Sequence, residues 1–299
     1  MLKRIALYLK EMFPPHHMLP SLLMALSFFC AMARFHHFTL TLSAIPVLAT
    51  ISLLVFVLTL RVMDEFKDYE DDLVNFPERP LPSGRVKHAD LRVLLAIVIL
   101  SAFPLNLHNK AIFIAAMGVL GYSFLMFRWF FMKERIRSSL PLALYTHNPI
   151  VYIYFAYLFV AYVQMDSGYS LLSVFIIIPL GLSMTNWEIS RKIRLSENES
   201  SYTTYSKVWG RKKAILIALT MQLTVLACTA IFLFVTGSPW TLTASFAALY
   251  CLIASKYITF MRIETDSGGK WDKIIPLRKY GELQGLLLQL TFIAAYFAG

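Results

Sequence analysis

Residues 44–72 read AIPVLATISLLVFVLTLRVMDEFKDYEDD, and they decide how the rest of the chain is interpreted. From 44 to 60 the stretch has no charged residue, and an apolar run of about 20 residues can cross ~30 Å of hydrocarbon as a helix. From 64 to 72 it holds six of the chain's 18 acidic residues. The pattern therefore predicts a membrane-spanning helix that ends in an acidic segment at one membrane surface.

Apolar stretches of spanning length recur along the whole chain. A hydrophobic content of 58% over 299 residues and a mean hydropathy of +0.60 exclude an ordinary soluble domain. Because lipid offers the backbone no hydrogen bonds, such spans form helices. We predict an all-α polytopic protein with a single membrane domain over 1–299. Its nine predicted spans are 18–35, 38–62, 89–107, 110–132, 138–164, 168–190, 213–236, 239–261 and 280–298.

The basic residues predict the orientation of these helices. If the N-terminus is cytoplasmic, all of the 28 Lys and Arg residues except Arg34 and Lys110 lie on the cytoplasmic side. This positive-inside bias explains the net charge of +10 without a nucleic-acid partner. Residues 1–13 alternate apolar and basic positions at helical spacing, which is typical of an interfacial helix. Because the sequence shows no targeting extension, the expected location is a bacterial inner membrane, with the charged loops on the cytoplasmic side.

The acidic segment 64–72 directly continues the second span. If the helix extends for two more turns, Asp64, Asp68 and Asp72 lie on one face at i, i+4 and i+8. Like charges at this spacing repel each other, so the face is stable mainly when a cation binds to it. Oxygen ligands in this number suit Mg²⁺, which completes its shell with water and phosphate oxygens. We therefore predict that these three aspartates bind Mg²⁺ and that Glu65 supports them at the metal site.

A basic turn follows the acids. Residues 75–87 read NFPERPLPSGRVK and carry Arg79, Arg85 and Lys87 within the first cytoplasmic loop, 64–88. Carboxylates that hold a metal, next to guanidinium and ammonium groups, form an arrangement that binds a diphosphate. The alternative is a solvated loop whose charges neutralise one another. The spacing of the acids on one face favours the diphosphate site.

Together the two motifs resemble those of a known family. DEFKDYEDD followed by RPLPSGRV resembles the first aspartate-rich motif of the UbiA-type intramembrane prenyltransferase superfamily, whose usual form is NDxxDxxxD followed by a basic RPL...G segment. Asp64 stands at the Asn position and Glu65 at the following Asp, while Asp68 and Asp72 match. The resemblance covers nearly the whole chain. It implies nine helices around a central cavity, with this motif in the loop after the second helix.

The resemblance also implies a second acidic motif, in the second cytoplasmic loop at 191–212. The sequence around this loop, residues 186–214, reads NWEISRKIRLSENESSYTTYSKVWGRKKA and matches the family only in part. By the resemblance, Glu188 and Glu197 are expected to bind metal. Where the family carries aspartates, however, the chain has Arg191 and Lys192, which would hold a diphosphate directly by charge. This departure leaves the number of metal ions open.

Other polar residues are candidates for substrate contacts. Asn148 and Asn186 lie in predicted spans, where polar side chains are costly and face the protein interior. We predict that both contact substrate, although a hydrogen bond between helices at a Pro149 kink explains Asn148 equally well. Arg128 stands where the family carries a Tyr...LysArg pattern, and the resemblance implies that it binds phosphate. Loop 262–279 is expected to be a solvated cap.

These residues predict a reaction. The site would neutralise a prenyl diphosphate, so that its allylic C–O bond ionises to a carbocation and pyrophosphate. The predicted function is a Mg²⁺-dependent intramembrane prenyltransferase that acts among membrane lipids and transfers the prenyl group to a small hydrophobic or aromatic acceptor. One alternative is a UbiA-type terpene cyclase, and another is a non-catalytic transporter or lipid-binding membrane protein. The predicted catalytic residues are Asp64, Asp68, Asp72, Arg191 and Lys192.

Overall fold

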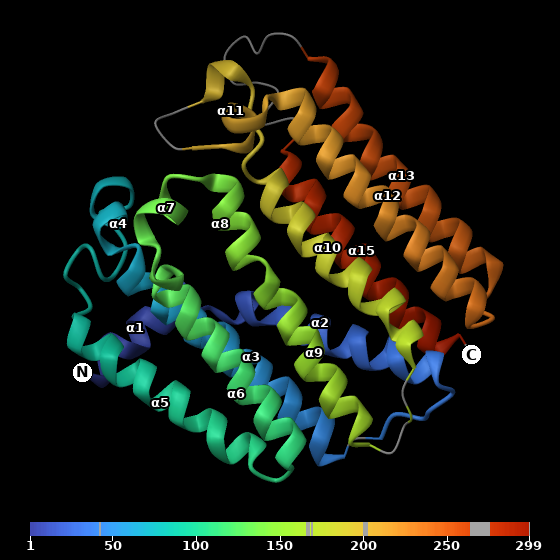
Figure 1. Cartoon of the computed structure of the whole chain (residues 1–299), viewed down its shortest axis with the longest axis horizontal. Helices are drawn as coiled ribbons and strands as arrows, with labels where there is room; N and C mark the ends of the chain where they lie inside the picture. Colours follow the sequence, from blue (N-terminus) through green and yellow to red (C-terminus); the bar gives the residue numbers. More distant parts are fainter. Residues whose placement is uncertain (42, 166–167, 169, 200–202, 264–275, 299) are drawn as a thin grey trace. The chain divides into compact units, whose positions relative to one another are not determined.

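The structure, a computed structural model, describes the chain except residues 42, 166–167, 169, 200–202, 264–275 and 299. The described residues form helices and connecting turns without β-strands, which confirms the predicted all-α fold (Figure 1). The expected cap at 262–279 lies largely outside them. The longer helices are α2 Pro15–Phe35, α3 Ala44–Lys67, α5 His88–Asn106, α6 Lys110–Phe127, α9 Pro149–Val163, α10 Val174–Ser190, α12 Arg211–Val235, α13 Trp240–Arg262 and α15 Leu277–Phe297. The shorter ones are α1 Leu2–Met12, α4 Tyr69–Asn75, η1 Trp129–Phe131, α7 Lys133–Arg137, α8 Leu140–His147, η2 Leu171–Ser173, η3 Ser196–Asn198 and α11 Tyr205–Trp209.

Two predicted spans differ from the helices that form. The span 138–164 is divided into α8 and α9 at Asn148, because the following Pro149 has no backbone N–H to continue the hydrogen-bond ladder. The span 110–132 ends at Phe127, because the next residues enter a left-handed turn. Both differences depend on backbone geometry rather than on hydropathy.

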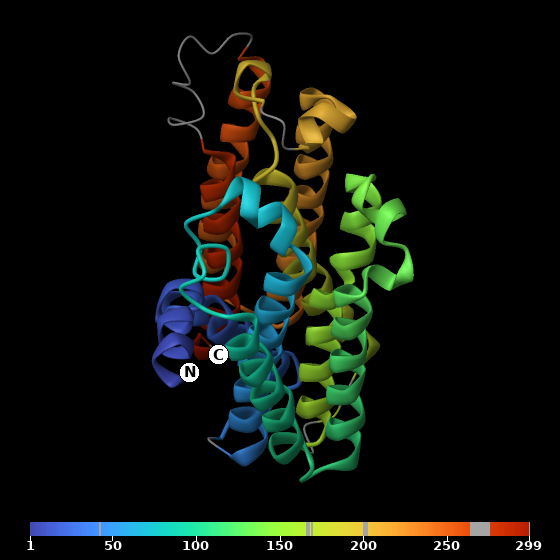
Figure 2. The same cartoon turned by 90° about the vertical axis from the view of Figure 1, so that its left-hand side faces the viewer.

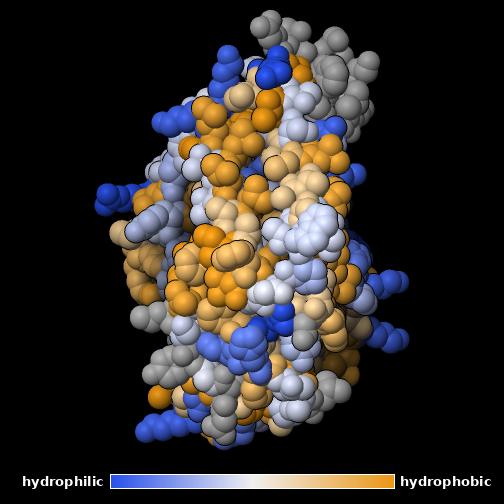
Figure 3. Space-filling view, turned by 90° about the vertical axis from the view of Figure 1, so that its right-hand side faces the viewer, coloured by the Kyte–Doolittle hydropathy of each residue, from blue (hydrophilic) through white to orange (hydrophobic). Residues whose placement is uncertain are grey.

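Six helices in the described part of the chain are long and apolar enough to cross a membrane, and α10 is a shorter apolar helix. On the face seen in Figure 3, hydrophobic residues cover much of the surface, and the most hydrophilic ones lie mainly toward its ends and edges. These observations support a multi-pass membrane protein. The count of nine spans and the cytoplasmic N-terminus stay predictions. The six helices are Met18–Phe35, Ala44–Lys67, His88–Asn106, Lys110–Phe127, Arg211–Val235 and Trp240–Arg262.

The chain divides into two compact units, and each unit is made of three segments that alternate with those of the other unit along the sequence. Unit 1 contains Met1–Leu26, Thr41–Arg137 and Ala156–Asp166. Unit 2 contains Ser27–Leu40, Ser138–Phe155 and Ser167–Gly299. Each unit has its own charged segment, so each is described by itself. The prediction of a single membrane domain stays a prediction.

Unit 1 is built around α3, which packs against α5 and α6; Figures 1 and 2 both show these helices side by side. The amphipathic α1 packs against α5 and buries Tyr8 in a cluster with Val62 and Leu91. Arg4 of α1 adds two hydrogen bonds to Asp90 of α5, at 2.6 and 2.9 Å. The apolar face of α1 is thus covered by protein, and its expected position at a membrane interface stays a prediction.

Unit 2 is built around α10, which packs against α12 and α15. A close approach of α10 and α15 depends on Gly281, because a Cβ there would lie 3.2 Å from the Cα of Trp187. Polar bonds between helices reinforce the packing: Asn186 donates to Gln284 at 3.1 Å, and the hydroxyls of Ser190 and Tyr257 lie 2.8 Å apart. This packing holds the end of α10, where the second charged segment begins.

Candidate functional site

The first charged segment begins where α3 ends. The predicted continuous helix from Asp64 to Asp72 is interrupted at Asp68, which has φ −101° and ψ 7° and separates α3 from α4. Figures 1 and 2 show α4 turning away from the axis of α3. The backbone N–H of Asp68 still donates to Asp64 O, and that of Asp72 to Asp68 O, each at 2.8 Å. The three aspartates therefore stay on successive turns despite the bend.

The three aspartates have different partners. Asp72 is buried and accepts two hydrogen bonds from Nη1 of Arg79, at 2.7 and 2.8 Å. Asp64 lies 3.8 Å from Nζ of Lys67. Among the described residues, the carboxylate of Asp68 has no hydrogen-bonded or ion-paired partner. Burial and the negative charge of nearby Asp64 raise the pKa of Asp68 to about 6, and the charge of Lys67 offsets this only in part.

Glu65 lies next to the three aspartates but has an arginine partner of its own. Its side chain is buried, and Oε1 lies 2.6 Å from Nη2 of Arg61, one helical turn earlier. Glu65 is thus paired with Arg61, which is partly exposed, and its binding of metal stays a prediction. A buried glutamate with its own cation is a poor candidate for a metal ligand.

Asp64 and Asp68 are the residues that fit Mg²⁺ best. Within the described ranges, no three Asp, Glu, His or Cys side chains are close enough together to ligate one ion. Mg²⁺ commonly uses only one or two carboxylates and takes its other ligands from water and substrate phosphate. Burial first, and then the negative charge of Asp64, raise the pKa of Asp68, and a divalent cation held by the two carboxylates would offset their repulsion. Mg²⁺ binding, and the part of Asp72 in it, stay predictions.

The basic turn after the acids is only partly directed toward them. Arg79 meets Asp72, and its guanidinium carbon lies 4.0 Å from the ring centroid of Phe76. Arg85, in contrast, bonds both carboxylate oxygens of Glu11 in α1, at 2.5 and 2.9 Å. Lys87 is exposed at the start of α5. Of the three cations predicted to bind diphosphate, Arg79 is the one that lies against the acidic row.

The sequence analysis did not identify two residues that lie beside Asp64, Asp68 and Asp72, namely Lys67 and Trp129. The Nζ of Lys67 lies 4.2 Å from the ring centroid of Trp129, as well as near Asp64. Trp129, Phe130 and Phe131 have φ values of 51°, 50° and 59°, a left-handed conformation that costs energy for bulky residues. No sequence signal indicated this turn, because an aromatic run at the end of a span is ordinary. Arg128 precedes the turn and is exposed.

The second charged segment has the opposite balance. Glu188, at the end of α10, accepts hydrogen bonds from Arg191 at 2.5 and 3.0 Å and lies 3.1 Å from Nζ of Lys192. Two cations thus lie at the carboxylate of Glu188, and metal binding by Glu188 and Glu197 stays a prediction. Glu197 lies farther along, in the short helix η3. This segment therefore presents positive charge and suits an anion better than a metal.

The two asparagines have separate environments. Asn186 is buried and donates to Gln284, a residue of α15 that the sequence analysis did not single out. Asn148 lines a groove of about 300 Å³ in unit 2, together with Tyr152 and Thr185. Its Nδ2 is buried and, among the described residues, has no hydrogen-bond partner. Such an unpaired donor favours contact with a ligand, and substrate binding by both asparagines stays a prediction.

Comparison with known proteins adds independent evidence. A family model for the UbiA prenyltransferase family matches residues 18–271. A solved structure of a digeranylgeranylglyceryl phosphate synthase in membranes is similar with a TM-score of 0.68 and 16% identity, covering 98% of this chain and 99% of that one. A UbiA homologue from Aeropyrum pernix K1, in its apo form, has a TM-score of 0.64 and 16% identity over 91% and 97% of the two chains. No curated protein matches. The structural likenesses show a shared fold, and the family match over most of the length shows that this chain belongs to the UbiA prenyltransferase family.

Proposed function

We propose that the protein is a Mg²⁺-dependent intramembrane prenyltransferase that ionises a prenyl diphosphate and transfers the prenyl group to a small hydrophobic or aromatic acceptor. Membership of the UbiA prenyltransferase family supports the class of reaction. The observation that carries the proposal is the pair Asp64 and Asp68: Asp64 lies 3.8 Å from Lys67, whereas no cation among the described residues pairs with the side chain of Asp68. Such a pair needs a cation, and a diphosphate brings Mg²⁺ with it.

The residues of the first charged segment, at the end of α3, would have different roles in binding the diphosphate. Asp64 and Asp68 would hold Mg²⁺, whose charge makes the diphosphate a better leaving group. Asp72 holds the guanidinium of Arg79 by two hydrogen bonds, so that arginine is fixed in place before a phosphate oxygen arrives. Lys67 lies between Asp64 and the Trp129 ring and would limit the repulsion when the metal is absent.

The residues of the second segment would bind anionic oxygen directly. Arg191 and Lys192 together carry one positive charge more than Glu188 removes. As negative charge develops on the leaving diphosphate, cations of this kind stabilise the transition state more than the ground state. The ring of Trp187, 5.4 Å from the guanidinium carbon of Arg191, helps to position that side chain.

The experiment is pyrophosphate release by purified protein in detergent. The donors are geranyl, farnesyl and geranylgeranyl diphosphate, with and without Mg²⁺ and with and without phenolic acceptors. Asp68→Asn is expected to lower release by about 10²-fold or more. Asp71→Asn is the matched control, because Asp71 belongs to the same segment but is half-exposed and bonded to Arg137. It should retain activity within about two-fold.

Several outcomes would decide the proposal. Release that needs Mg²⁺ and Asp68, with the prenyl group recovered on an added acceptor, supports it. A cyclised hydrocarbon or alcohol formed without any acceptor would replace prenyl transfer by terpene cyclisation. No release from any donor, or equal loss in Asp68→Asn and Asp71→Asn, would contradict it.

A further inference from the structure

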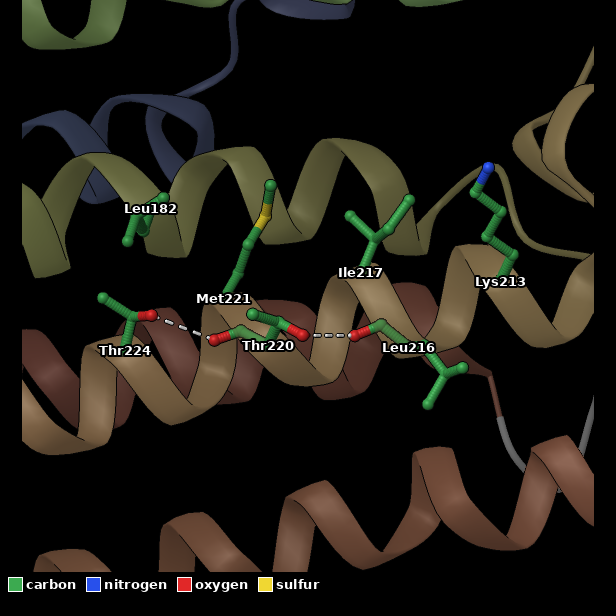
Figure 4. Close-up of a pocket in the computed structure, with 7 residues that line it drawn as sticks. All are labelled: Leu182, Lys213, Leu216, Ile217, Thr220, Met221 and Thr224. Carbon is green, nitrogen blue, oxygen red and sulfur yellow. Dashed lines mark hydrogen bonds between the residues drawn. The ribbon is translucent and has the colours of Figure 1, made fainter.

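A groove of about 310 Å³ runs between α10 and α12 in unit 2. Figure 4 shows its lining: Leu182 comes from α10, and six residues between Lys213 and Thr224 come from α12. The side chains of Ile217 and Met221 point toward the α10 ribbon. All of these residues belong to unit 2, and apart from Lys213 none lies in the second motif at 186–214.

The groove is more apolar than its sequence suggests. The hydroxyl of Thr220 donates to Leu216 O at 2.9 Å, and that of Thr224 donates to Thr220 O at 3.1 Å, as the dashed lines in Figure 4 show. Because both hydroxyls are satisfied within α12, the threonines add little polarity to the groove. Lys213 is the charged residue of the lining and stands at one end of the row.

The length of the groove matches one leaflet of a bilayer. Lys213 and Thr224 are eleven residues apart on one helix, or about 16 Å at a rise of 1.5 Å per residue. Half of a hydrocarbon core of ~30 Å is about 15 Å. Lys213 is the third residue of a helix that is apolar enough to span the membrane, so its ammonium lies near the level of lipid headgroups.

We propose that this groove binds an anionic glycerophospholipid, with an acyl chain along the apolar wall and the phosphate on Lys213. Lys213 is exposed, and within the described part of the chain no acidic side chain pairs with it. The neighbouring Arg211 donates instead to the carbonyl oxygen of Ile263. One lysine complements the single negative charge of a phosphodiester.

A phospholipid fits this groove better than a prenyl diphosphate does. The groove is open along its side, with Leu216 53% exposed, so it would not shield a carbocation from nucleophiles. It also lacks the acidic pair that would hold a metal for a diphosphate.

The test of the headgroup contact is lipid binding measured by native mass spectrometry of the purified protein in detergent. The probes are palmitoyl-oleoyl phosphatidylglycerol and phosphatidylcholine, which share their chains and differ in net charge. The wild type is expected to bind phosphatidylglycerol more tightly. Lys213→Gln should lower the affinity for phosphatidylglycerol by about five-fold, Lys213→Arg should restore it, and the adjacent Lys212→Gln, which lies outside the groove, should change it by less than two-fold.

The test of the chain contact uses two substitutions of α12. Thr220→Phe fills the groove and should weaken both lipids alike, whereas Leu223→Phe, at a 66% exposed position outside it, should not. Equal effects of Lys213→Gln and Lys212→Gln would overturn the proposal, as would equal binding of both lipids to the wild type. Displacement of phosphatidylglycerol by equimolar geranylgeranyl diphosphate would assign the groove to that donor and overturn it as well.

Discussion

The charged segments at the ends of α3 and α10 each follow an apolar helix, yet their local charges are opposite in sign. At the end of α3, residues 64–72 contain six acids and one lysine, and Asp68 lacks a described partner. At the end of α10, one glutamate is shared by Arg191 and Lys192. A segment with excess carboxylate is suited to bind a cation, and a segment with excess cation is suited to bind an anion without one.

This difference changes how the second segment is interpreted. The family resemblance implied that Glu188 and Glu197 bind metal. The side chains around Glu188 instead neutralise it, because Arg191 and Lys192 follow it at i+3 and i+4 on the same helical face. We therefore expect the metal requirement to depend on the first segment alone, and the following experiments test that division.

The largest effect is expected from Asp64→Asn. Loss of one carboxylate from the Asp64 and Asp68 pair should weaken Mg²⁺ binding and lower pyrophosphate release by about 10²-fold. A titration of activity with Mg²⁺ checks this, since the half-saturating concentration should rise. Glu70→Gln is the control, because Glu70 is exposed and lies 4.0 Å from Lys133. An unchanged Mg²⁺ requirement in Asp64→Asn would break the comparison.

Asp72→Asn is expected to affect stability as well as activity. It removes one charge from a buried carboxylate that accepts two hydrogen bonds from Arg79, and hydrogen bonds to charged groups contribute about 1.5–3 kcal/mol. The free energy of unfolding of the detergent-solubilised protein should fall by about 2 kcal/mol. If Asp72 is mainly a metal ligand, the Asp72→Asn protein will have the thermal stability of the wild type without Mg²⁺. It will then lose only the additional stabilisation that Mg²⁺ gives the wild type.

Substitutions in the second segment sharpen the contrast. Arg191→Gln combined with Lys192→Gln should raise the KM for the prenyl diphosphate by about ten-fold, because two phosphate-binding cations are lost. The Mg²⁺ concentration at half-maximal activity should stay unchanged. Glu188→Gln frees both cations and should keep the activity or lower the KM. A large loss of Mg²⁺ affinity in Glu188→Gln would show that Glu188 is a ligand after all.

The smallest expected effect is the change in Tm with pH that results from the ion pair between Glu11 of α1 and Arg85. The Arg85 guanidinium beside Glu11 holds the pKa of that carboxyl below its usual range. A lowered folded-state pKa means that the pair stabilises the protein above the unfolded pKa of about 4.3, and that this contribution is lost as the pH falls through the folded-state pKa. Glu11→Gln should therefore lower the Tm slightly at pH 7 and by less at pH 3. An equal change at both pH values would contradict the role of the charge.

The helices and the spacing of the three aspartates could be predicted from the sequence, because both depend on patterns among neighbouring residues. Apolar runs predicted the positions of the longer helices, and the spacing of Asp64, Asp68 and Asp72 predicted successive turns. Motifs of the UbiA type predicted the family, which the family match confirms. The break at Asp68 was missed, because helical periodicity does not distinguish a straight helix from one that bends within a turn.

What the sequence by itself determined is therefore the all-α membrane class, the position of the helices, the family, and the residues that could bind metal or phosphate. Only the tertiary structure decided which charges meet: Arg85 binds Glu11, 74 residues away, and Lys67 lies on the Trp129 ring. It also decided that the α10 and α12 groove ends in a lysine. Hydropathy and spacing are properties of neighbouring residues, whereas an ion pair depends on side-chain direction and on the packing of distant helices.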